Sequence, residues 1–189
     1  MYPLTLETPR LVLREFEDAD HVDVNVYERD PEVIRYQGFD AALSLDETLE
    51  RIRKARADTL ASNPRTLFEL AVVTRSDQTV IGKVGLNVRR PAHREAEIWY
   101  CFRRAAWGQG YAVEAMRKLL DFGFGNQQLH RVFADTDPRN IASQRLAEKL
   151  GMKREGHIRE NWFLKGEWCD SLLYGLLARE WTSSGEKVR

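Results

Sequence analysis

The chain has few cysteines, no excess of charge and no long apolar run, and each of these absences excludes a class of protein. Its two cysteines, Cys101 and Cys169, form neither a disulfide framework nor a metal-binding spacing. The 29 basic residues balance 29 acidic ones, so no overall field favours nucleic acid or an anionic membrane. No stretch approaches the roughly 20 apolar residues of a membrane span, and the first residues do not resemble an export signal. We therefore expect a cytoplasmic protein that binds neither nucleic acid nor membrane.

Length and continuity indicate one domain. A chain of 189 residues with 43% hydrophobic content can bury one substantial core and is short for two. No internal repeat or low-complexity linker divides it. We predict a single domain over residues 1–182, followed by a flexible tail over 183–189.

Hydrophobic patterning predicts a mixed sheet flanked by helices. Apolar runs predict about seven strands, near 10–16, 67–73, 79–86, 95–102, 130–135, 152–158 and 171–177. Helical spacing predicts four or so helices: a short one after Asp18, one over 45–61, one from 111 and one over 140–150. The first is expected to turn Val22, Val26 and Tyr27 inward, and a Ser44–Glu47 capping box precedes the second. The order of strands and helices is typical of the α+β class.

Two glycines one residue apart, Gly108 and Gly110, stand between a strand-like run and an amphipathic helix. Glycine adopts left-handed backbone conformations that let N–H groups point outward, and a helix N-terminus attracts anions. We predict that this turn holds a pyrophosphate through the backbone of Trp107, Gly108, Gln109, Gly110, Tyr111 and Ala112. An ordinary tight turn is the alternative. A second segment over 137–143, followed by a short helix and Gly151, favours the pyrophosphate interpretation.

With both segments identified, the chain resembles the GNAT superfamily of acyl-CoA-dependent N-acetyltransferases, and within it the RimJ/RimL type. Five pieces carry the resemblance in the same order over nearly the whole chain: 8–14, 107–115, 129–132, 140–143 with 150–152, and 154–156 with 166–170. Many members of the superfamily carry Gln or Arg where this chain has Ala105. RimJ/RimL-type members often lack that residue as well, so the difference favours this subgroup.

The resemblance implies a twisted sheet whose fourth and fifth strands splay apart to admit the pantetheine arm of acetyl-CoA, with no metal. It implies that the backbone of Tyr100, Cys101 and Phe102 hydrogen-bonds the pantetheine amides. It also implies that the side chains of Asn140 and Ser143 lie along the arm near the thiol. Asn140 can alternatively serve only as the cap of its helix.

Acetyl transfer needs a neutral amine, a polarised thioester carbonyl and a proton for the departing thiolate. A protein α-amine has a pKa of about 7.7–8.0, against about 10.4 for lysine, so it needs less help from a base. Glu97 is the candidate base and Ser143 the candidate proton donor, while a backbone N–H of 100–102 polarises the carbonyl. Glu97 alternatively lies on a solvated strand face. Cys101 is expected to be a small core residue rather than a nucleophile.

These expectations favour direct transfer of an acetyl group to a protein or peptide N-terminal α-amine. A polyamine, amino acid or aminoglycoside acceptor is the alternative, as is a non-catalytic acyl-CoA sensor. The acidic run over 15–32 either borders the acceptor cleft or is a solvated helix face. Tyr36, Trp162 and Phe163 are candidates to line the acceptor pocket. Aromatic residues near 162–168 either support a homodimer or pack internally.

Overall fold

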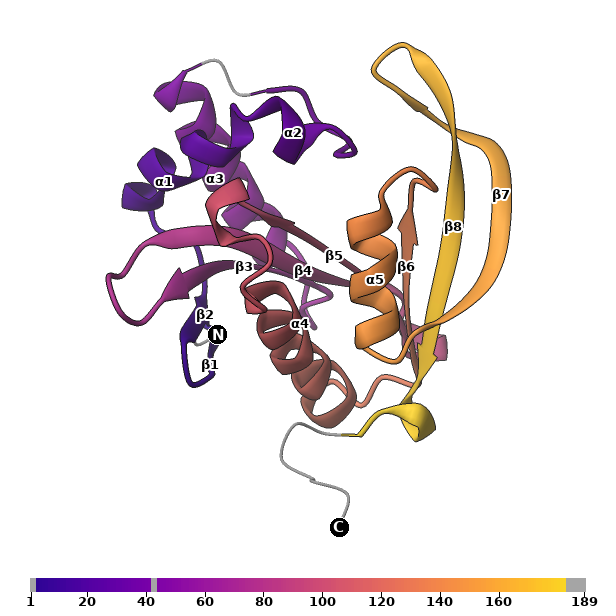
Figure 1. The fold of residues 1–189 in the computed structure, drawn as a ribbon. Coiled ribbons are helices and arrows are strands. Elements are labelled where there is room, and N and C mark those ends of the chain that lie inside the picture. Colours follow the sequence, from indigo (N-terminus) through magenta and orange to yellow (C-terminus); the bar gives the residue numbers. More distant parts are fainter. Residues whose placement is uncertain (1–2, 42–43, 183–189) are drawn as a thin grey trace.

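The computed structural model describes residues 3–41 and 44–182, and a mixed sheet of eight strands runs through this part of the chain (Figure 1). The strands are β1 Thr5–Glu7, β2 Leu11–Arg14, β3 Leu67–Thr74, β4 Val80–Arg90, β5 Glu95–Phe102, β6 Arg131–Thr136, β7 Lys153–Leu164 and β8 Glu167–Leu177. Their order in the sheet is β1-β2-β3-β4-β5-β6-β8-β7. The pair β5–β6 is parallel and the other neighbours are antiparallel. The predicted α+β class is confirmed, with β1 as one strand more than predicted. The predicted tail over 183–189 lies outside the described residues.

Five α-helices of the described residues lie on the sheet: α1 His21–Glu28, α2 Pro31–Ile34, α3 Leu45–Leu60, α4 Tyr111–Asp121 and α5 Ile141–Lys149. The Ser44–Glu47 capping box is confirmed at the start of α3. Helices α4 and α5 lie together on one side of the sheet, while α1, α2 and α3 gather near one end of β3, β4 and β5 (Figure 1). No helix of the described residues is long and apolar enough to cross a membrane.

Alternate side chains of β5 enter two different hydrophobic clusters, which fixes the two faces of the sheet. Ala96, Ile98 and Phe102 pack in the cluster that contains Met116 of α4. Cys101 packs in the other cluster, with residues of α1 and α3. Its side chain is buried, as predicted for a core cysteine.

The prediction that Val22 and Val26 face inward from α1 is wrong. Their side chains are 53% and 61% exposed, whereas Val24 is buried in their place and Tyr27 is buried as expected. The inward stripe of α1 also contains the carboxylate of Glu28, which is buried against Arg51 and Lys83. Because this stripe is partly charged, the apolar pattern alone selected the wrong face of the helix.

Strands β5 and β6 separate after three residue pairs. Their register runs from Glu95↔Arg131 to Glu97↔Phe133 and stops there. Beyond this point β5 continues to pair with β4 as far as Phe102, and β6 continues to pair with β8 as far as Thr136. The gap between them confirms the predicted splay of the fourth and fifth strands, which are β5 and β6 once β1 is counted.

The hairpin of β7 and β8 is longer than predicted and arches away from the rest of the sheet (Figure 1). Its turn reaches the end of α2, where Lys165 Nζ donates a hydrogen bond to the carbonyl of Ile34, the last residue of that helix. The Trp162 ring lies beside Gly38, since a Cβ placed on Gly38 would be 3.1 Å from it. Two segments far apart in sequence therefore meet above the gap between β5 and β6.

Candidate functional site

A cleft of ≈ 590 Å³ opens beside the free edge of β5. Four segments supply its walls: the end of α2 with the residues after it, the end of β5, the glycine turn with the start of α4, and α5. Lining residues include Tyr36, Tyr100, Cys101, Phe102, Trp107, Gly108, Gly110, Ala112, Asn140 and Ser143. The structure thus brings together most of the residues that the sequence assigned to the cofactor.

The glycine turn has the backbone conformation that the sequence predicted. Gly108 and Gly110 have φ values of 74° and 80°, and Gly110 is the N-cap of α4. No side chain caps this helix among the described residues, so the N–H groups of its first turn remain available for an anion. Trp107 Nε1 donates to the Phe102 carbonyl at 2.8 Å, which fixes the turn to the end of β5.

The side chains of Gln109 and Tyr111 do not line the cleft. Gln109 Nε2 donates to the Ala105 carbonyl at 2.5 Å. The Tyr111 ring lies 4.4 Å from the Arg10 guanidinium carbon. Any contribution of these two residues to an anion site would therefore come from their backbone.

Basic side chains gather around the cleft: Arg35, Arg139, Arg145 and Lys149. The N-terminal end of α4 adds partial positive charge, because the amides of a helix align at that end. Glu32 contributes a carboxylate to the lining. The balance of charge suits a polyanionic ligand such as a diphosphate.

Asn140 caps α5 and also lines the cleft, so its two predicted roles are compatible. Its Oδ1 accepts a hydrogen bond from the Ser143 amide at 3.1 Å. The Ser143 hydroxyl lies 2.5 Å from the Tyr100 hydroxyl, which is also 3.3 Å from the Ser143 carbonyl. Burial raises the pKa of Tyr100 to about 12, so its hydroxyl keeps its proton at neutral pH.

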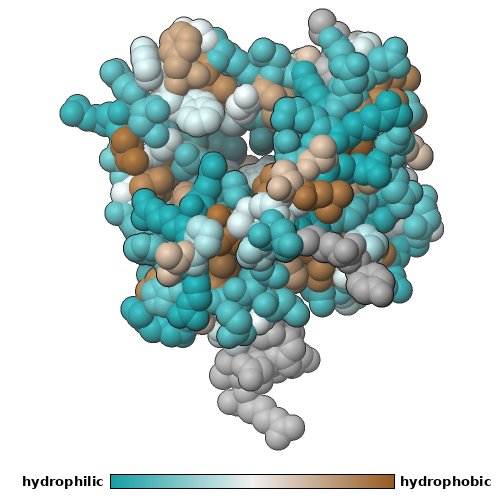
Figure 2. All heavy atoms as spheres, turned by 180° about the vertical axis from the view of Figure 1, so that it is seen from behind, coloured by the Kyte–Doolittle hydropathy of each residue, from teal (hydrophilic) through white to brown (hydrophobic). Residues whose placement is uncertain are grey.

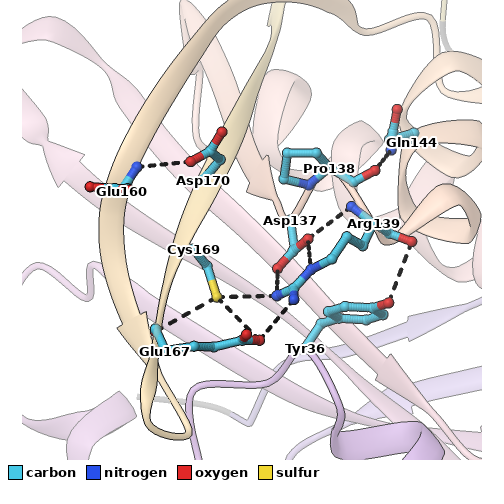
Figure 3. Close-up of polar contacts among 9 residues, drawn as sticks. All are labelled: Tyr36, Asp137, Pro138, Arg139, Gln144, Glu160, Glu167, Cys169 and Asp170. Atoms are coloured by element: carbon cyan, nitrogen blue, oxygen red, sulfur yellow. Dashed lines mark hydrogen bonds and ion pairs between the residues drawn. The ribbon is translucent and has the colours of Figure 1, made fainter.

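Arg139 connects the cleft to the β7–β8 hairpin (Figure 3). Its guanidinium donates two hydrogen bonds to Asp137, at 2.9 and 2.6 Å, one to Glu167 at 2.7 Å and one to Cys169 Sγ at 3.1 Å. The Tyr36 hydroxyl donates to the Arg139 carbonyl at 3.4 Å. The guanidinium lowers the pKa of the Asp137 carboxyl below its usual range. This contact network joins β8, the start of α5 and the segment after α2.

Glu97 is not among the residues that line the cleft. It lies on the opposite face of β5 from Ile98, and its carboxylate forms an ion pair with Arg89 at 2.6 Å. Its negative charge acts on Asp135 of β6. The structure therefore separates Glu97 from Ser143, with the free edge of β5 between them.

The acidic run over 15–32 is mostly engaged in ion pairs. These join Glu15 to Arg65, Asp18 to Arg53 and Arg56, Asp20 to Arg14, Glu28 to Arg51 and Lys83, and Asp30 to Arg104. Of the run's carboxylates, Glu32 lines the cleft. Trp162 and Phe163 are 48% and 60% exposed and do not line it, whereas Tyr36 does.

Sequence reasoning missed the Arg139 network. The network depends on contacts between segments that only the folded chain brings together. The spacing of Asp137 and Arg139 beside the helix cap was the available signal for the network, since two oppositely charged residues two positions apart can pair in a turn.

The family model and the related sequences both identify N-acetyltransferases. Residues 10–153 match the family model described as an acetyltransferase (GNAT) domain. An N-acetyltransferase of Bacillus licheniformis, named p20 and uncharacterized, is 32% identical over 94% of this chain and 98% of its own length. A [ribosomal protein uS5]-alanine N-acetyltransferase of Escherichia coli is 26% identical over 61% of this chain and 60% of its own length.

Solved structures share the fold. A GNAT-family acetyltransferase from Bacillus anthracis superposes with a TM-score of 0.81 at 27% identity, covering 94% of this chain and 100% of its own. A spermidine N-acetyltransferase from Vibrio cholerae, solved with CoA and spermine, has a TM-score of 0.77 at 24% identity, covering 92% and 98%. At that identity the second similarity shows the fold alone.

Proposed function

The chain belongs to the GNAT acetyltransferase family, and on that premise we propose that it transfers an acetyl group from acetyl-CoA to a protein or peptide N-terminal α-amine. The amine attacks directly, with both substrates bound at once. The observation that carries this proposal is the cleft beside the separated strands, where an uncapped helix end, a glycine turn and the basic side chains Arg35, Arg145 and Lys149 meet.

The residues of the cleft fit acetyl-CoA. The amides of 107–112 and the neighbouring cations would hold the diphosphate. The backbone of Tyr100, Cys101 and Phe102 faces the gap on the side where β5 has no partner strand, so its polar groups can hydrogen-bond the pantetheine amides. Gln37 Nε2 already donates to the Tyr100 carbonyl, at the long distance of 3.5 Å. Asn140 and Ser143 would lie near the thioester.

The transfer forms a C–N bond and breaks the C–S bond. In the proposal the amine nitrogen attacks the thioester carbonyl carbon, and a backbone N–H of 100–102 stabilises the developing oxyanion. The C–S electron pair leaves with sulfur, which takes a proton from the Ser143 hydroxyl. Tyr100 can donate to Ser143 Oγ in turn, because the two oxygens are 2.5 Å apart. Glu97 is the proposed base: its carboxylate takes, through a water, the proton that the attacking nitrogen loses and then returns it to solvent.

An α-amine is favoured as the acceptor for two reasons. Its pKa of about 7.7–8.0 leaves part of it neutral at neutral pH, so a site without a dedicated histidine can use it. The similarity to the uS5-alanine N-acetyltransferase points the same way. A polyamine is the second candidate, since the spermidine N-acetyltransferase shares this fold. An acyl-CoA sensor without turnover and a homodimer built on the exposed aromatics near 162–168 remain further proposals.

An acceptor screen with detection of released CoA thiol tests this proposal. N-terminal peptides, polyamines and aminoglycosides are compared at equal concentration, with lysine-containing peptides blocked at the N-terminus as the control. Release that depends on a free α-amine supports the proposal. Release of CoA thiol with spermidine but not with peptides would contradict the α-amine acceptor and identify a polyamine as the acceptor. Thermal stabilisation by acetyl-CoA with no release on any amine would favour the sensor.

A further inference from the structure

We propose that Arg10, in the turn between β1 and β2, is a positioning residue for acetyl-CoA that holds the glycine turn in the shape that binds the diphosphate. The inference rests on the part of the proposed function that places acetyl-CoA in the cleft. It goes beyond that function by giving a task to the segment 8–14, whose residues are not among those that line the cleft. Arg10 acts on the backbone of the glycine turn rather than on the cofactor itself.

The turn between β1 and β2 lies against the start of α4. Figure 1 shows β1 and β2 beside this helix, and both strands contact it. Arg10 is the last residue before β2, and its side chain packs on the glycine turn. A Cβ built on Gly110 would be 3.5 Å from Arg10 Nη2. The guanidinium carbon also lies 4.4 Å from the centre of the ring of Tyr111, the first residue of α4.

One arm of the guanidinium holds a backbone carbonyl of the glycine turn. Arg10 Nη1 donates to the Gln109 carbonyl at 3.0 Å. The peptide bond between Gln109 and Gly110 is trans and planar, so its N–H points away from its carbonyl. With this carbonyl held by Arg10, the N–H of Gly110 is directed away from Arg10, and Gly110 lines the cleft. The contact therefore orients one of the amides that would hold the diphosphate.

The rest of Arg10 is anchored on the first turn of α4. Arg10 Nε donates to Glu114 Oε2 at 2.6 Å, and the Arg10 backbone N–H donates to Glu114 Oε1 at 3.0 Å. Thr8 Oγ1 donates to the same Oε1 at 2.6 Å. The short segment before β2 thus ties one carboxylate of the helix with three hydrogen bonds. Because the anchor lies on α4 and the held carbonyl lies on the turn before it, Arg10 bridges the two.

The Arg10–Glu114 pair also balances charge at the helix end. Glu114 is an acidic residue in the first turn of α4, where a second negative group such as a diphosphate would be repelled. Burial alone would raise the pKa of the Glu114 carboxyl, but the hydrogen bonds from Thr8 and Arg10 lower it, so the carboxylate is ionised at neutral pH. The guanidinium at 2.6 Å offsets this charge. Without Arg10, the diphosphate would meet an unbalanced carboxylate.

The first test is the dissociation constant of CoA, measured by calorimetry for the wild-type protein and Arg10→Gln. We expect the variant to bind CoA about tenfold more weakly, because it loses a charge-assisted hydrogen bond to the turn and leaves Glu114 unbalanced. In turnover, KM for acetyl-CoA should rise while kcat is retained, since Arg10 is remote from the thioester end of the cleft. A merely structural role would not separate KM from kcat in this way.

Arg75→Gln is the matched control. Arg75 is 47% exposed against 46% for Arg10, and its Nη1 also ties the start of the chain, to Glu7 at 3.0 Å and to the Thr8 carbonyl at 3.2 Å. Any surface arginine attracts an anion to some degree, and hydrophilic residues cover much of the molecule seen from behind (Figure 2). The control removes one such charge without touching the glycine turn, so its affinity for CoA should equal that of the wild type.

A truncated donor gives a second readout. S-acetylpantetheine carries the thioester and the pantetheine arm but no diphosphate. Arg10→Gln should therefore lower kcat/KM about tenfold with acetyl-CoA and leave it unchanged with S-acetylpantetheine. Arg10→Lys tests the bridge itself, because an ammonium keeps the charge but lacks the fixed fork of a guanidinium. It should recover only part of the lost affinity.

The outcomes separate this inference from the proposed function. CoA binding that is unchanged in Arg10→Gln, or weakened equally in Arg75→Gln, overturns the inference and leaves the proposed function standing. An equal loss with both donors overturns it as well, because the effect would not depend on the diphosphate. Full recovery in Arg10→Lys would show that charge alone is needed and overturn the bridging role. A wild-type protein that binds no CoA overturns both.

Discussion

The hydroxyl oxygens of Tyr100 and Ser143 lie 2.5 Å apart, joining the end of β5 to the first turn of α5 across the cleft. Tyr100 is partly buried, and desolvation raises the pKa of its phenol to about 12, so the proton stays on it at neutral pH. If Tyr100 donates to Ser143 Oγ, the serine proton is directed away from the tyrosine and toward the cleft. The pair can then act as one proton donor to the departing thiolate.

Removing either hydroxyl should therefore have the same effect. We predict that Tyr100→Phe and Ser143→Ala each lower kcat about tenfold or more, as loss of a general acid does, with little change in KM for acetyl-CoA. The double variant should lose no more than the larger single loss, because the two groups act as a unit. Steady-state kinetics of all three variants measure this, and strictly multiplicative losses would show that the hydroxyls act independently.

The glycine turn gives a test of cofactor binding that is separate from chemistry. Gly110 has a φ of 80°, and a side chain in that conformation costs about 1–2 kcal/mol in addition to the obstruction of the neighbouring amides. We predict that Gly110→Val abolishes the thermal stabilisation by CoA. The control is Gly166→Val, at φ 88° in the β7–β8 turn, where a Cβ meets no atom within 4 Å. It should destabilise the protein to a similar extent but keep the response to CoA, and a lost response in both variants would contradict the assignment.

The Arg139–Asp137 pair predicts a pH dependence of stability. The pKa of Asp137 is lowered in the folded protein by the guanidinium, so its contribution is present above the unfolded pKa of about 3.9 and is lost as pH falls through the folded value. Arg139 is half-exposed, so we expect Arg139→Gln to reduce the free energy of unfolding by about 1 kcal/mol at pH 7. Urea unfolding at pH 7 and pH 3 should show the difference shrinking at acid pH.

A control for that experiment is the exposed pair Lys54–Asp58 on α3, at 2.7 Å. Lys54→Gln should change stability by less than about 0.5 kcal/mol at pH 7. The account of Arg139 would be contradicted if its variant lost the same free energy at both pH values.

Gly85 of β4 makes room for the ring of Trp99, which is its partner residue on β5. Gly85→Ala should displace that ring and lower the free energy of unfolding by about 1–3 kcal/mol, which urea unfolding measures. Gly125→Ala is the matched control, since a Cβ there meets no atom within 4 Å. Equal free energies of unfolding for the two variants would show that the Trp99 ring does not need the space beside Gly85.

Local patterns in the sequence determine much of this fold. The glycine turn, the Ser44–Glu47 capping box and the Asn140 cap are set by neighbouring residues, and the structure has them where predicted. Strand β1 was missed because three residues, Thr5–Glu7, carry too short a pattern. The inward face of α1 was partly misjudged because Glu28, which pairs with Arg51 and Lys83, lies on it.

The site is less accessible to sequence reasoning than the fold. The cofactor residues share two contiguous segments and could be named from them. The face of β5 on which Glu97 lies and the point at which β5 and β6 separate both depend on strand register. Register is a property of the assembled sheet, so neither could be read from spacing along the chain.

A crystal structure of the protein grown with CoA tests the central claim most directly. The account predicts the pantetheine arm in the gap between β5 and β6, hydrogen-bonded to the backbone of 100–102, with the diphosphate on the amides of 107–112. Coenzyme bound outside the cleft, or a diphosphate without contact to the glycine turn, would contradict it.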